Sequence, residues 1–237
     1  MGDQVVDFAQ VFEKTDLRIS REMVRKFEKY ADLLIDWNEK INLTAIVDPQ
    51  EIAVKHFLDS VLALNAIAIP YGSAIIDVGT GAGFPGMPIK IVRPDVNLTL
   101  LDSLNKRIKF LNDLSDKLEI EVKLVHERAE DAAQKKDFRE SFDVAISRAV
   151  APLNVLLEYC LPFVKVDGVF IALKGSNVQS ELDLAQNAIK NLNAEIFTQK
   201  SFSLVNDCDR SIIVFKKTAK NLEIYPRNSA KIKKKPL

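Results

Sequence analysis

The stretch Ile75–Pro88 reads Ile-Ile-Asp-Val-Gly-Thr-Gly-Ala-Gly-Phe-Pro-Gly-Met-Pro and holds four of the eight glycines in the chain. Its apolar start is typical of a β-strand. Glycine at alternate positions, Gly79, Gly81 and Gly83, lets the backbone turn sharply and approach a ligand where any Cβ would intrude. Asp77 ends the strand, where its carboxylate can accept hydrogen bonds from a cationic ligand or orient the loop amides. This pattern indicates a nucleotide-cofactor loop, although glycine spacing alone is weak evidence.

Composition bounds the class of protein. The chain has 237 residues, 47% of them hydrophobic, which is enough for one large core with an appendage or for two small domains. Its 33 basic and 33 acidic residues balance, so bulk charge says nothing about a nucleic-acid partner. Cys160 and Cys208 form no C-x-x-C motif and the chain has only 2 histidines, so we predict no metal site.

Neither a signal peptide nor a membrane span is predicted. Residues 1–14 carry Asp3, Asp7 and Glu13 and lack a basic start followed by an apolar core. No apolar run approaches the length of a transmembrane helix. We therefore expect a soluble, cytoplasmic protein without a membrane partner.

Two amphipathic helices are predicted ahead of the first strand. Between Ser20 and Ile41, apolar residues recur at spacings of three and four, the period of a helix with one buried face. A second helix is expected to begin after Asp48, a good capping residue, and to end at about Leu64. We expect residues 1–70 to form a helical extension packed on the main fold.

Short apolar runs then alternate with helical periods. The runs predicted as strands are 74–78, 97–101, 121–125, 142–146 and 169–173. This alternation is typical of a parallel, doubly wound sheet. The runs 195–202 and 211–215 are joined by a short polar loop and should form an antiparallel hairpin. Helices are expected over 104–118, with Ser103 as a possible cap, and over 182–192.

Ligands of such sheets bind outside the carboxyl ends of the strands, so residues at those ends are candidate site residues. Asp102 ends the second strand, where one carboxylate can accept from both hydroxyls of a ribose. Ala129 and Glu130 follow the third strand and could read an adenine edge through a backbone amide and a carboxylate. Phe84 could pack on the ligand, and Arg148 is a cationic donor after the fourth strand.

Both NAD and S-adenosylmethionine suit a glycine loop followed by a ribose carboxylate. Pro85 and Pro88 remove amide donors that a pyrophosphate would use. An acidic residue beside the loop favours a sulfonium cofactor with an amino group over a diphosphate. We therefore predict S-adenosylmethionine, and a nicotinamide-dependent dehydrogenase stays the alternative.

Six motifs together resemble one family. They are Asp77-Val-Gly-Thr-Gly-Ala-Gly-Phe-Pro-Gly, Asp102-Ser-Leu-Asn-Lys-Arg, Arg128-Ala-Glu, Ser147-Arg-Ala-Val-Ala, Trp37-Asn-Glu-Lys-Ile-Asn-Leu-Thr and His56-Phe-Leu-Asp-Ser. Over nearly the whole chain they are similar to the bacterial 16S rRNA guanine-N7 methyltransferase G family. The resemblance implies methylation of N7 of guanine-527, by customary rRNA numbering, on a seven-stranded, doubly wound class I (Rossmann-like) methyltransferase sheet with an antiparallel last strand. It assigns cofactor contacts to Gly79, Phe84, Ala129, Glu130 and Arg148.

The chemistry of such a reaction needs few helpers. Guanine N7 has an in-plane lone pair, so it can attack a sulfonium methyl group directly, and no general base is required. The task is then mainly alignment, for which Arg148 is the best candidate. We interpret His56 as a hydrogen-bonded helix histidine and not a base, and Cys160 as a buried thiol and not a nucleophile. Tyr30 lies on an apolar stripe and is expected in the core.

A basic tail, residues 218–237, follows the predicted methyltransferase domain of residues 71–217. The tail is expected either to be a solvated terminus or to contact RNA phosphates, with Arg227, Lys231 and Lys233 as candidate RNA-binding residues. We expect a monomer whose partner is 16S rRNA or the small ribosomal subunit. A non-catalytic RNA-binding protein on the same fold is the second alternative.

Overall fold

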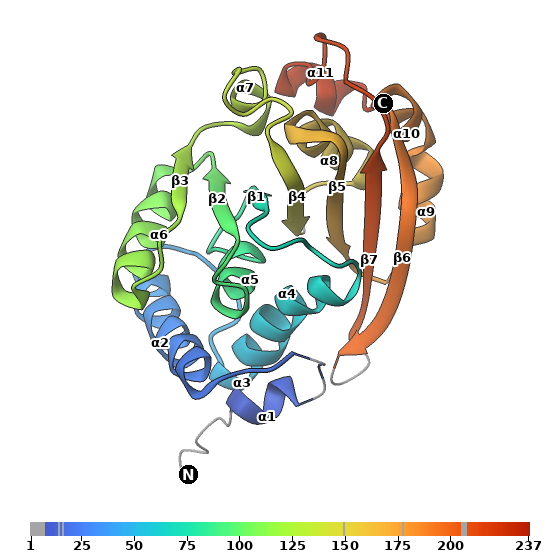
Figure 1. The fold of residues 1–237 in the computed structure, drawn as a ribbon. Coiled ribbons are helices and arrows are strands. Elements are labelled where there is room, and N and C mark those ends of the chain that lie inside the picture. Colours follow the sequence, from blue (N-terminus) through green and yellow to red (C-terminus); the bar gives the residue numbers. More distant parts are fainter. Residues whose placement is uncertain (1–7, 14, 16, 149, 177, 205–207) are drawn as a thin grey trace.

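The computed structural model describes residues 8–13, 15, 17–148, 150–176, 178–204 and 208–237, and its centre is a seven-stranded sheet in the order β3-β2-β1-β4-β5-β7-β6 (Figure 1). The strands are β1 (Ala74–Val78), β2 (Asn97–Asp102), β3 (Lys123–His126), β4 (Phe142–Arg148), β5 (Val164–Lys174), β6 (Ala194–Leu204) and β7 (Cys208–Lys217). Strands β1 to β5 pair in parallel, and β7 runs antiparallel to both β5 and β6. The predicted parallel sheet and terminal hairpin are confirmed.

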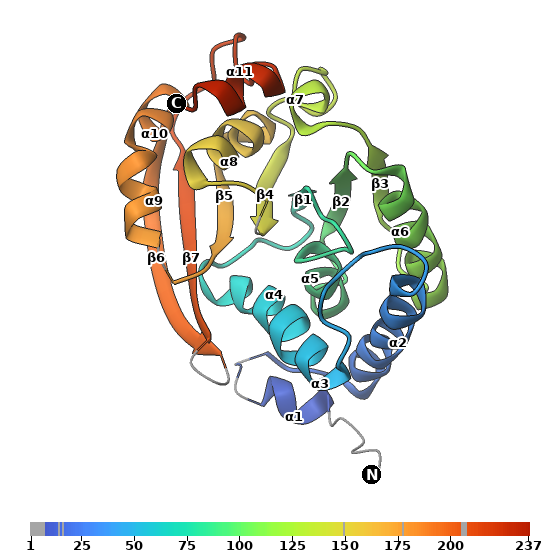
Figure 2. The same cartoon turned by 180° about the vertical axis from the view of Figure 1, so that it is seen from behind.

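Helices cover both faces of the sheet, as the two opposite views show (Figures 1 and 2). One face carries α1 (Phe8–Phe12), α2 (Arg21–Asn38), α3 (Pro49–Ile52), η1 (Ala53–Leu58), α4 (Asp59–Val61), η2 (Leu62–Asn65), α5 (Gly86–Val92) and α6 (Asn105–Leu118). The other carries α7 (Ala129–Ala132), α8 (Leu153–Cys160), η3 (Leu161–Phe163), α9 (Val178–Leu184), α10 (Gln186–Asn191) and α11 (Ser229–Lys234). In the described part of the chain, no helix is both long and apolar enough to cross a membrane.

Successive side chains of the central strands pack alternately into two separate hydrophobic clusters, one on each face of the sheet. In β5, Ile171 and Leu173 join the cluster under α2 to α6, whereas Phe170 and Ala172 join the one under α8 to α10. Successive strand residues point to opposite faces, and here both faces are covered. The parallel strands therefore read as continuous apolar runs in the sequence.

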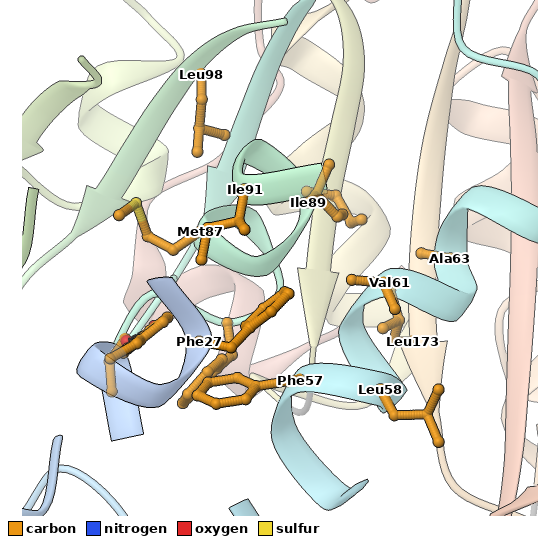
Figure 3. Packing of buried hydrophobic residues seen from close by; sticks show 14 of the residues in the cluster. Phe27, Phe57, Leu58, Val61, Ala63, Met87, Ile89, Ile91, Leu98 and Leu173 are labelled. Atoms are coloured by element: carbon orange, nitrogen blue, oxygen red, sulfur yellow. Dashed lines mark hydrogen bonds between the residues drawn. The ribbon is translucent and has the colours of Figure 1, made fainter. Parts of the chain in front are cut away.

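The N-terminal helices share a hydrophobic core with α5 and with strands β1 and β2. Figure 3 shows Phe27 of α2 and Phe57 of η1 close to one another, near Met87 of α5. The ring centroids of Phe27 and Phe57 are 5.0 Å apart, and all three side chains are fully buried. Burial of each such side chain contributes about 1.5–3 kcal/mol. This packing anchors the N-terminal helices beside the glycine loop.

The second predicted helix is one continuous helical run from Pro49 to Asn65 in which η1 is a π-helix. Asp48 caps it as predicted, because its side chain accepts a hydrogen bond from the Glu51 amide at 2.8 Å. π-helical turns inside α-helices are frequent at functional sites. Here the run carries His56 and Asp59, which both reach the carboxyl end of β4.

Three local predictions differ from the structure. Ser103 does not cap α6: the Leu104 amide donates to Asp102 Oδ1 at 2.8 Å, so the strand-end carboxylate satisfies this turn. The helix predicted over 182–192 is broken at Ala185 into α9 and α10. Strand β5 begins at Val164, earlier than predicted, because it pairs with β4 across an irregularity in register. The loop before β7 lies largely outside the described residues.

The tail is ordered by packing and is not a solvated terminus. Ile232 of α11 is fully buried in the cluster under α8. The Arg139 guanidinium donates to the Tyr225 carbonyl at 2.7 Å, and the Gln134 amide donates to the Pro226 carbonyl at 2.9 Å. Both views place α11 beside α7, at the end of the molecule opposite α1 (Figures 1 and 2).

Candidate functional site

A cavity of about 950 Å³ lies at the carboxyl ends of the parallel strands. Seven of the eight predicted cofactor residues line it: Gly79, Gly81, Phe84, Asp102, Ala129, Glu130 and Arg148. They come from the ends of β1, β2, β3 and β4, segments that are far apart in the sequence. The site predicted from strand ends is thus one continuous space.

The glycine loop forms the floor of the cavity through backbone that other residues rarely adopt. Gly79, Gly81 and Gly83 have φ of 71°, 63° and 95°. A Cβ on Gly79 would lie 2.8 Å from Val150 Cγ2, whereas one on Gly81 would meet nothing within 4 Å. Gly79 is therefore required for packing, and Gly81 leaves open space that a ligand can fill.

Asp77 is the eighth predicted residue, and it does not line the cavity. Its side chain is fully buried, and Oδ2 accepts from the Thr80 hydroxyl at 2.7 Å and from the Gly86 amide at 2.8 Å. Burial raises the pKa of this carboxyl to about 7, against the opposing effect of those two hydrogen bonds. Of its two predicted roles, the geometry supports orientation of the loop and not contact with a ligand.

Asp102 faces the cavity but already holds three donors. Its Oδ2 accepts from the Gly81 amide at 3.0 Å and from Arg107 Nη1 at 3.1 Å, and Oδ1 accepts from the Leu104 amide. Ribose hydroxyls would therefore compete with Arg107 for this carboxylate. Arg107, on α6, is partly buried and lines the cavity.

Phe84 is wedged among three side chains from distant segments. Its ring centroid is 4.5 Å from that of His56 and 5.4 Å from that of Tyr30, and the Arg148 guanidinium carbon lies 4.9 Å from it. The Tyr30 hydroxyl donates to the Ala82 carbonyl, so the predicted core tyrosine also holds the loop. This arrangement fixes the loop against the N-terminal helices.

Arg148 makes several contacts within a cluster of largely buried charged side chains. Its Nη1 donates to Asp59 Oδ2 at 2.8 Å and to the Lys55 carbonyl at 3.1 Å. Arg210 Nε lies 3.2 Å from Asp59 Oδ1, so one carboxylate joins two guanidinium groups. Asp59 is only 3% exposed. Arg148 is therefore held firmly in place, which an exposed ion pair would not achieve.

His56 completes this cluster as a neutral ring. Burial, followed by the positive charge of Arg148, lowers its pKa to about 3. Its Nε2 lies 2.8 Å from Thr44 Oγ1, and its Nδ1 lies 3.2 Å from Arg148 Nη2. The prediction of a hydrogen-bonded histidine is confirmed. That the ring also lines the cavity was not predicted.

Cys160 is fully buried, and burial raises the pKa of its thiol well above the ordinary value. It does not line the cavity, so its predicted inertness agrees with the geometry.

The C-terminal tail supplies one wall of the cavity, which the sequence did not predict. Ser229, Lys233 and Pro236 are lining residues. Arg227 Nη2 lies 2.6 Å from Glu158 Oε2, and the Arg227 amide and Nε both donate to Glu158 Oε1. Because Glu158 is fully buried, this bidentate pair docks the tail on α8. Arg227 thus has a structural partner, whereas Lys231 and Lys233 are exposed.

Sequence comparison identifies relatives over the full chain. The family model for rRNA small subunit methyltransferase G matches residues 23–213. A ribosomal RNA small subunit methyltransferase G of Desulforamulus reducens is 45% identical over 100% of both chains. One of Clostridium perfringens is 47% identical over 95% of both chains.

Structural comparison supports the fold. A putative class I S-adenosylmethionine-dependent methyltransferase from Listeria monocytogenes superimposes with a TM-score of 0.58 at 14% identity, covering 83% of this chain and 70% of that one. At this identity the likeness shows the class I methyltransferase fold alone. The relatives at 45% and 47% identity carry the assignment further and decide against a nicotinamide-dependent dehydrogenase. The chain belongs to the rRNA small subunit methyltransferase G family and is an S-adenosylmethionine-dependent methyltransferase.

Proposed function

We propose that this enzyme transfers the methyl group of S-adenosylmethionine to N7 of guanine-527 in bacterial 16S rRNA. The observation that carries the proposal is the single cavity that gathers seven residues predicted for the cofactor from four strand ends. The names of its relatives, which specify small-subunit ribosomal RNA, support the substrate class. The atom and the base follow from the resemblance of the sequence motifs.

The residues of the cavity fit this cofactor. Gly81 offers open space for close backbone approach by its methionine part, and Gly79 lines the cavity beside it. Asp102 would accept from the ribose hydroxyls as Arg107 moves aside, and Ala129 and Glu130 would hold the adenine edge. Phe84 and Arg148 border the space where these parts would meet. Asp77 acts from behind the loop and does not touch the cofactor.

The transfer needs alignment and no proton movement. The cofactor supplies an electrophilic methyl group on a positively charged sulfur. Held by Gly81, Asp102, Ala129 and Glu130, it would give this methyl group to N7, and its sulfur would keep the electron pair of the broken bond. The positive charge moves to the guanine ring. His56 fits this scheme because a ring with a pKa of about 3 stays neutral, and the reaction asks no proton transfer of it.

Arg148 is the residue we assign to positioning. Its two nitrogens are fixed by Asp59, His56 and the Lys55 carbonyl, so the guanidinium cannot swing freely. A fixed cation at the end of β4 can orient an oxygen of the RNA substrate beside the methyl group. Correct orientation in such reactions contributes up to about 7–11 kcal/mol.

RNA contacts at the rim are assigned to Lys231 and Lys233 of α11, which are exposed beside the cavity. The predicted contact of Arg227 is set aside because its guanidinium holds Glu158. We further propose that the enzyme acts as a cytoplasmic monomer on 16S rRNA or the small ribosomal subunit, with residues 1–70 and 218–237 as appendages of the domain over 71–217.

The test is transfer of labelled methyl from S-adenosylmethionine to 16S rRNA, followed by nucleoside analysis and mapping of the modified position. We expect one methyl group at N7 of guanine-527. Label on another atom or another base would contradict the substrate assignment. Binding of cofactor and RNA without transfer would instead favour a non-catalytic RNA-binding protein.

A further inference from the structure

A second cavity, of about 480 Å³, lies beside the first at the carboxyl ends of β4 and β5. The two cavities share His56 and Arg148 as lining residues. None of the residues predicted for the cofactor other than Arg148 lines the second one. Its volume is within the range of small-molecule sites. Because it adjoins the cofactor cavity, a substrate bound in it would lie next to the methyl group of the cofactor.

The lining of this second cavity carries excess positive charge. Its basic side chains are Lys55, Arg148, Lys174 and Arg210, and its carboxylates are Asp59 and Glu181. Lys55 also pairs with Glu51 outside the lining, at 2.6 Å, so four positive groups face three negative ones, and the remaining excess favours an anionic ligand such as a nucleotide with its phosphate. The Asp59 carboxylate is occupied by Arg148 and Arg210, which leaves Glu181 as the candidate acceptor for a ligand.

Glu181 is held rigidly by one of its two oxygens. Its Oε2 accepts from the Leu153 amide at 2.7 Å and lies 2.7 Å from Lys174 Nζ. Lys174 in turn donates to the Ala151 carbonyl at 2.9 Å, so the pair also fixes the segment that follows β4. From the described part of the chain, no hydrogen bond reaches Glu181 Oε1. The side chain is 29% exposed, so this oxygen is a preorganised acceptor at the cavity wall.

Resting on the proposed function, we propose that the second cavity receives the target guanine nucleotide and that Glu181 is a specificity-determining residue that accepts from guanine N1–H and N2–H₂. Oε1 has two lone pairs and can accept from both donors, whereas adenine presents an acceptor, N1, at the same place. N7 lies on the opposite edge of the purine, so a base held at Glu181 presents N7 away from α9. Lys174 is held beside Glu181, which leaves Lys55, Arg148 and Arg210 to interact with its phosphate.

The test compares guanosine with inosine, which lacks the 2-amino group, at the target position of a ligated 16S rRNA. Single-turnover kcat/KM is measured at saturating cofactor for the full-length enzyme, for Glu181→Gln and for Asp183→Asn. Asp183 lies on the same helix, is exposed and bonds Gln179, so it is a matched loss of charge outside the cavity. We expect the wild type and Asp183→Asn to prefer guanosine by about tenfold. Glu181→Gln should be about tenfold slower on guanosine and should lose most of that preference.

Cofactor affinity by calorimetry reports separately on the fold of each variant, and it should not change in Glu181→Gln. Retention of the full guanosine preference by Glu181→Gln would overturn the inference. Equal use of guanosine and inosine by the wild type would overturn it without any variant. Absence of methyl transfer by the wild type to guanosine RNA would be a different failure, that of the proposed function itself.

Discussion

The two halves of the site are built in different ways. The glycine loop at the end of β1 is local: Asp77 bonds Thr80 and Gly86, only 3 and 9 residues away. The charged cluster at the end of β4 is not, because Arg148 bonds Asp59 and Lys55, 89 and 93 residues away. The local structure can be recognised from one continuous motif, whereas Asp59 and Arg148 lie in two separate motifs that do not show that the two side chains meet. In the proposed function, the first half would bind the cofactor, and the second would select and position the substrate.

The largest expected effect is at the centre of the non-local half. Asp59→Ala removes the carboxylate that joins Arg148 and Arg210, and it leaves two partly buried guanidinium groups without their common partner. Removal of one partner of a buried pair costs about 3–5 kcal/mol. Urea unfolding should show a loss of this size, together with loss of methyl transfer.

The matched control is Glu51→Ala on the same helical run. The Glu51 carboxylate lies 2.6 Å from Lys55 Nζ, but its side chain is 48% exposed. A surface pair of this kind contributes about 0–1 kcal/mol. If both variants lost the same small amount of stability, the Asp59 cluster would not be a structural centre.

The local half should be most sensitive at Gly83. A Cβ there would lie 2.5 Å from the Tyr30 hydroxyl, and φ is +95°. Gly83→Ala therefore combines backbone strain with overpacking and should lower the free energy of unfolding by about 2–4 kcal/mol in total. Gly81→Ala has positive φ but open space, so it should cost about 1–2 kcal/mol and mainly weaken cofactor binding. Unfolding curves and calorimetry on both variants test this difference. Equal destabilisation would contradict the packing of the loop against α2.

Asp77 gives the local half a pH dependence. Its folded pKa of about 7 lies above the ordinary value of 3.8 because of burial, so the folded state binds the proton more tightly than the unfolded state. The associated stability is complete below about pH 3.8 and is lost as the pH rises to about 7. The neutral variant Asp77→Asn lacks this loss.

The free energy of unfolding of Asp77→Asn relative to wild type should therefore rise from pH 5 to pH 8, by at least about 1.4 kcal/mol. Denaturation without cofactor at the two pH values measures this change. The variant comparison is necessary because His56, with its pKa lowered to about 3, has the opposite effect on wild-type stability between about pH 3 and 6.5. A difference that is the same at both pH values would mean that Asp77 is ionised in the folded protein.

The smallest expected effects are at the rim. Lys231→Ala removes one exposed cation from α11 and should lower the slope of log affinity for RNA against log salt by about 0.7–0.9, with stability within about 0.5 kcal/mol of wild type. Arg227→Ala should instead lower the stability and leave the salt slope unchanged, because it removes the cationic partner of the buried Glu158 carboxylate. RNA binding at several salt concentrations distinguishes the two. An unchanged slope in Lys231→Ala would remove α11 from the RNA-binding surface.

The same difference in construction explains what the sequence could predict. Strands, loop and strand-end residues have periodic or motif signals, and seven of eight predicted cofactor residues line one cavity. The prediction for Asp77 was correct in part. Its place at the strand end was predicted, but its burial decides that the side chain orients the loop and does not contact a ligand. Asp59 lies in a quoted motif and Glu181 in none, but neither position predicts its partners, because these are set by helix packing. For the tail, a solvated terminus was one of two alternatives, and the structure excludes it, because Asn221 and Ile232 are buried within an otherwise largely exposed stretch.

The most direct measurement is the single-turnover rate of methyl transfer to 16S rRNA by Arg148→Lys at saturating cofactor. Lysine keeps the charge but cannot hold Asp59 and His56 together through two nitrogens, as the guanidinium does. If Arg148 positions the reactants, the rate should fall by between about tenfold and a hundredfold, with all label still at N7. A wild-type rate in a folded, cofactor-loaded variant would contradict the central role of Arg148.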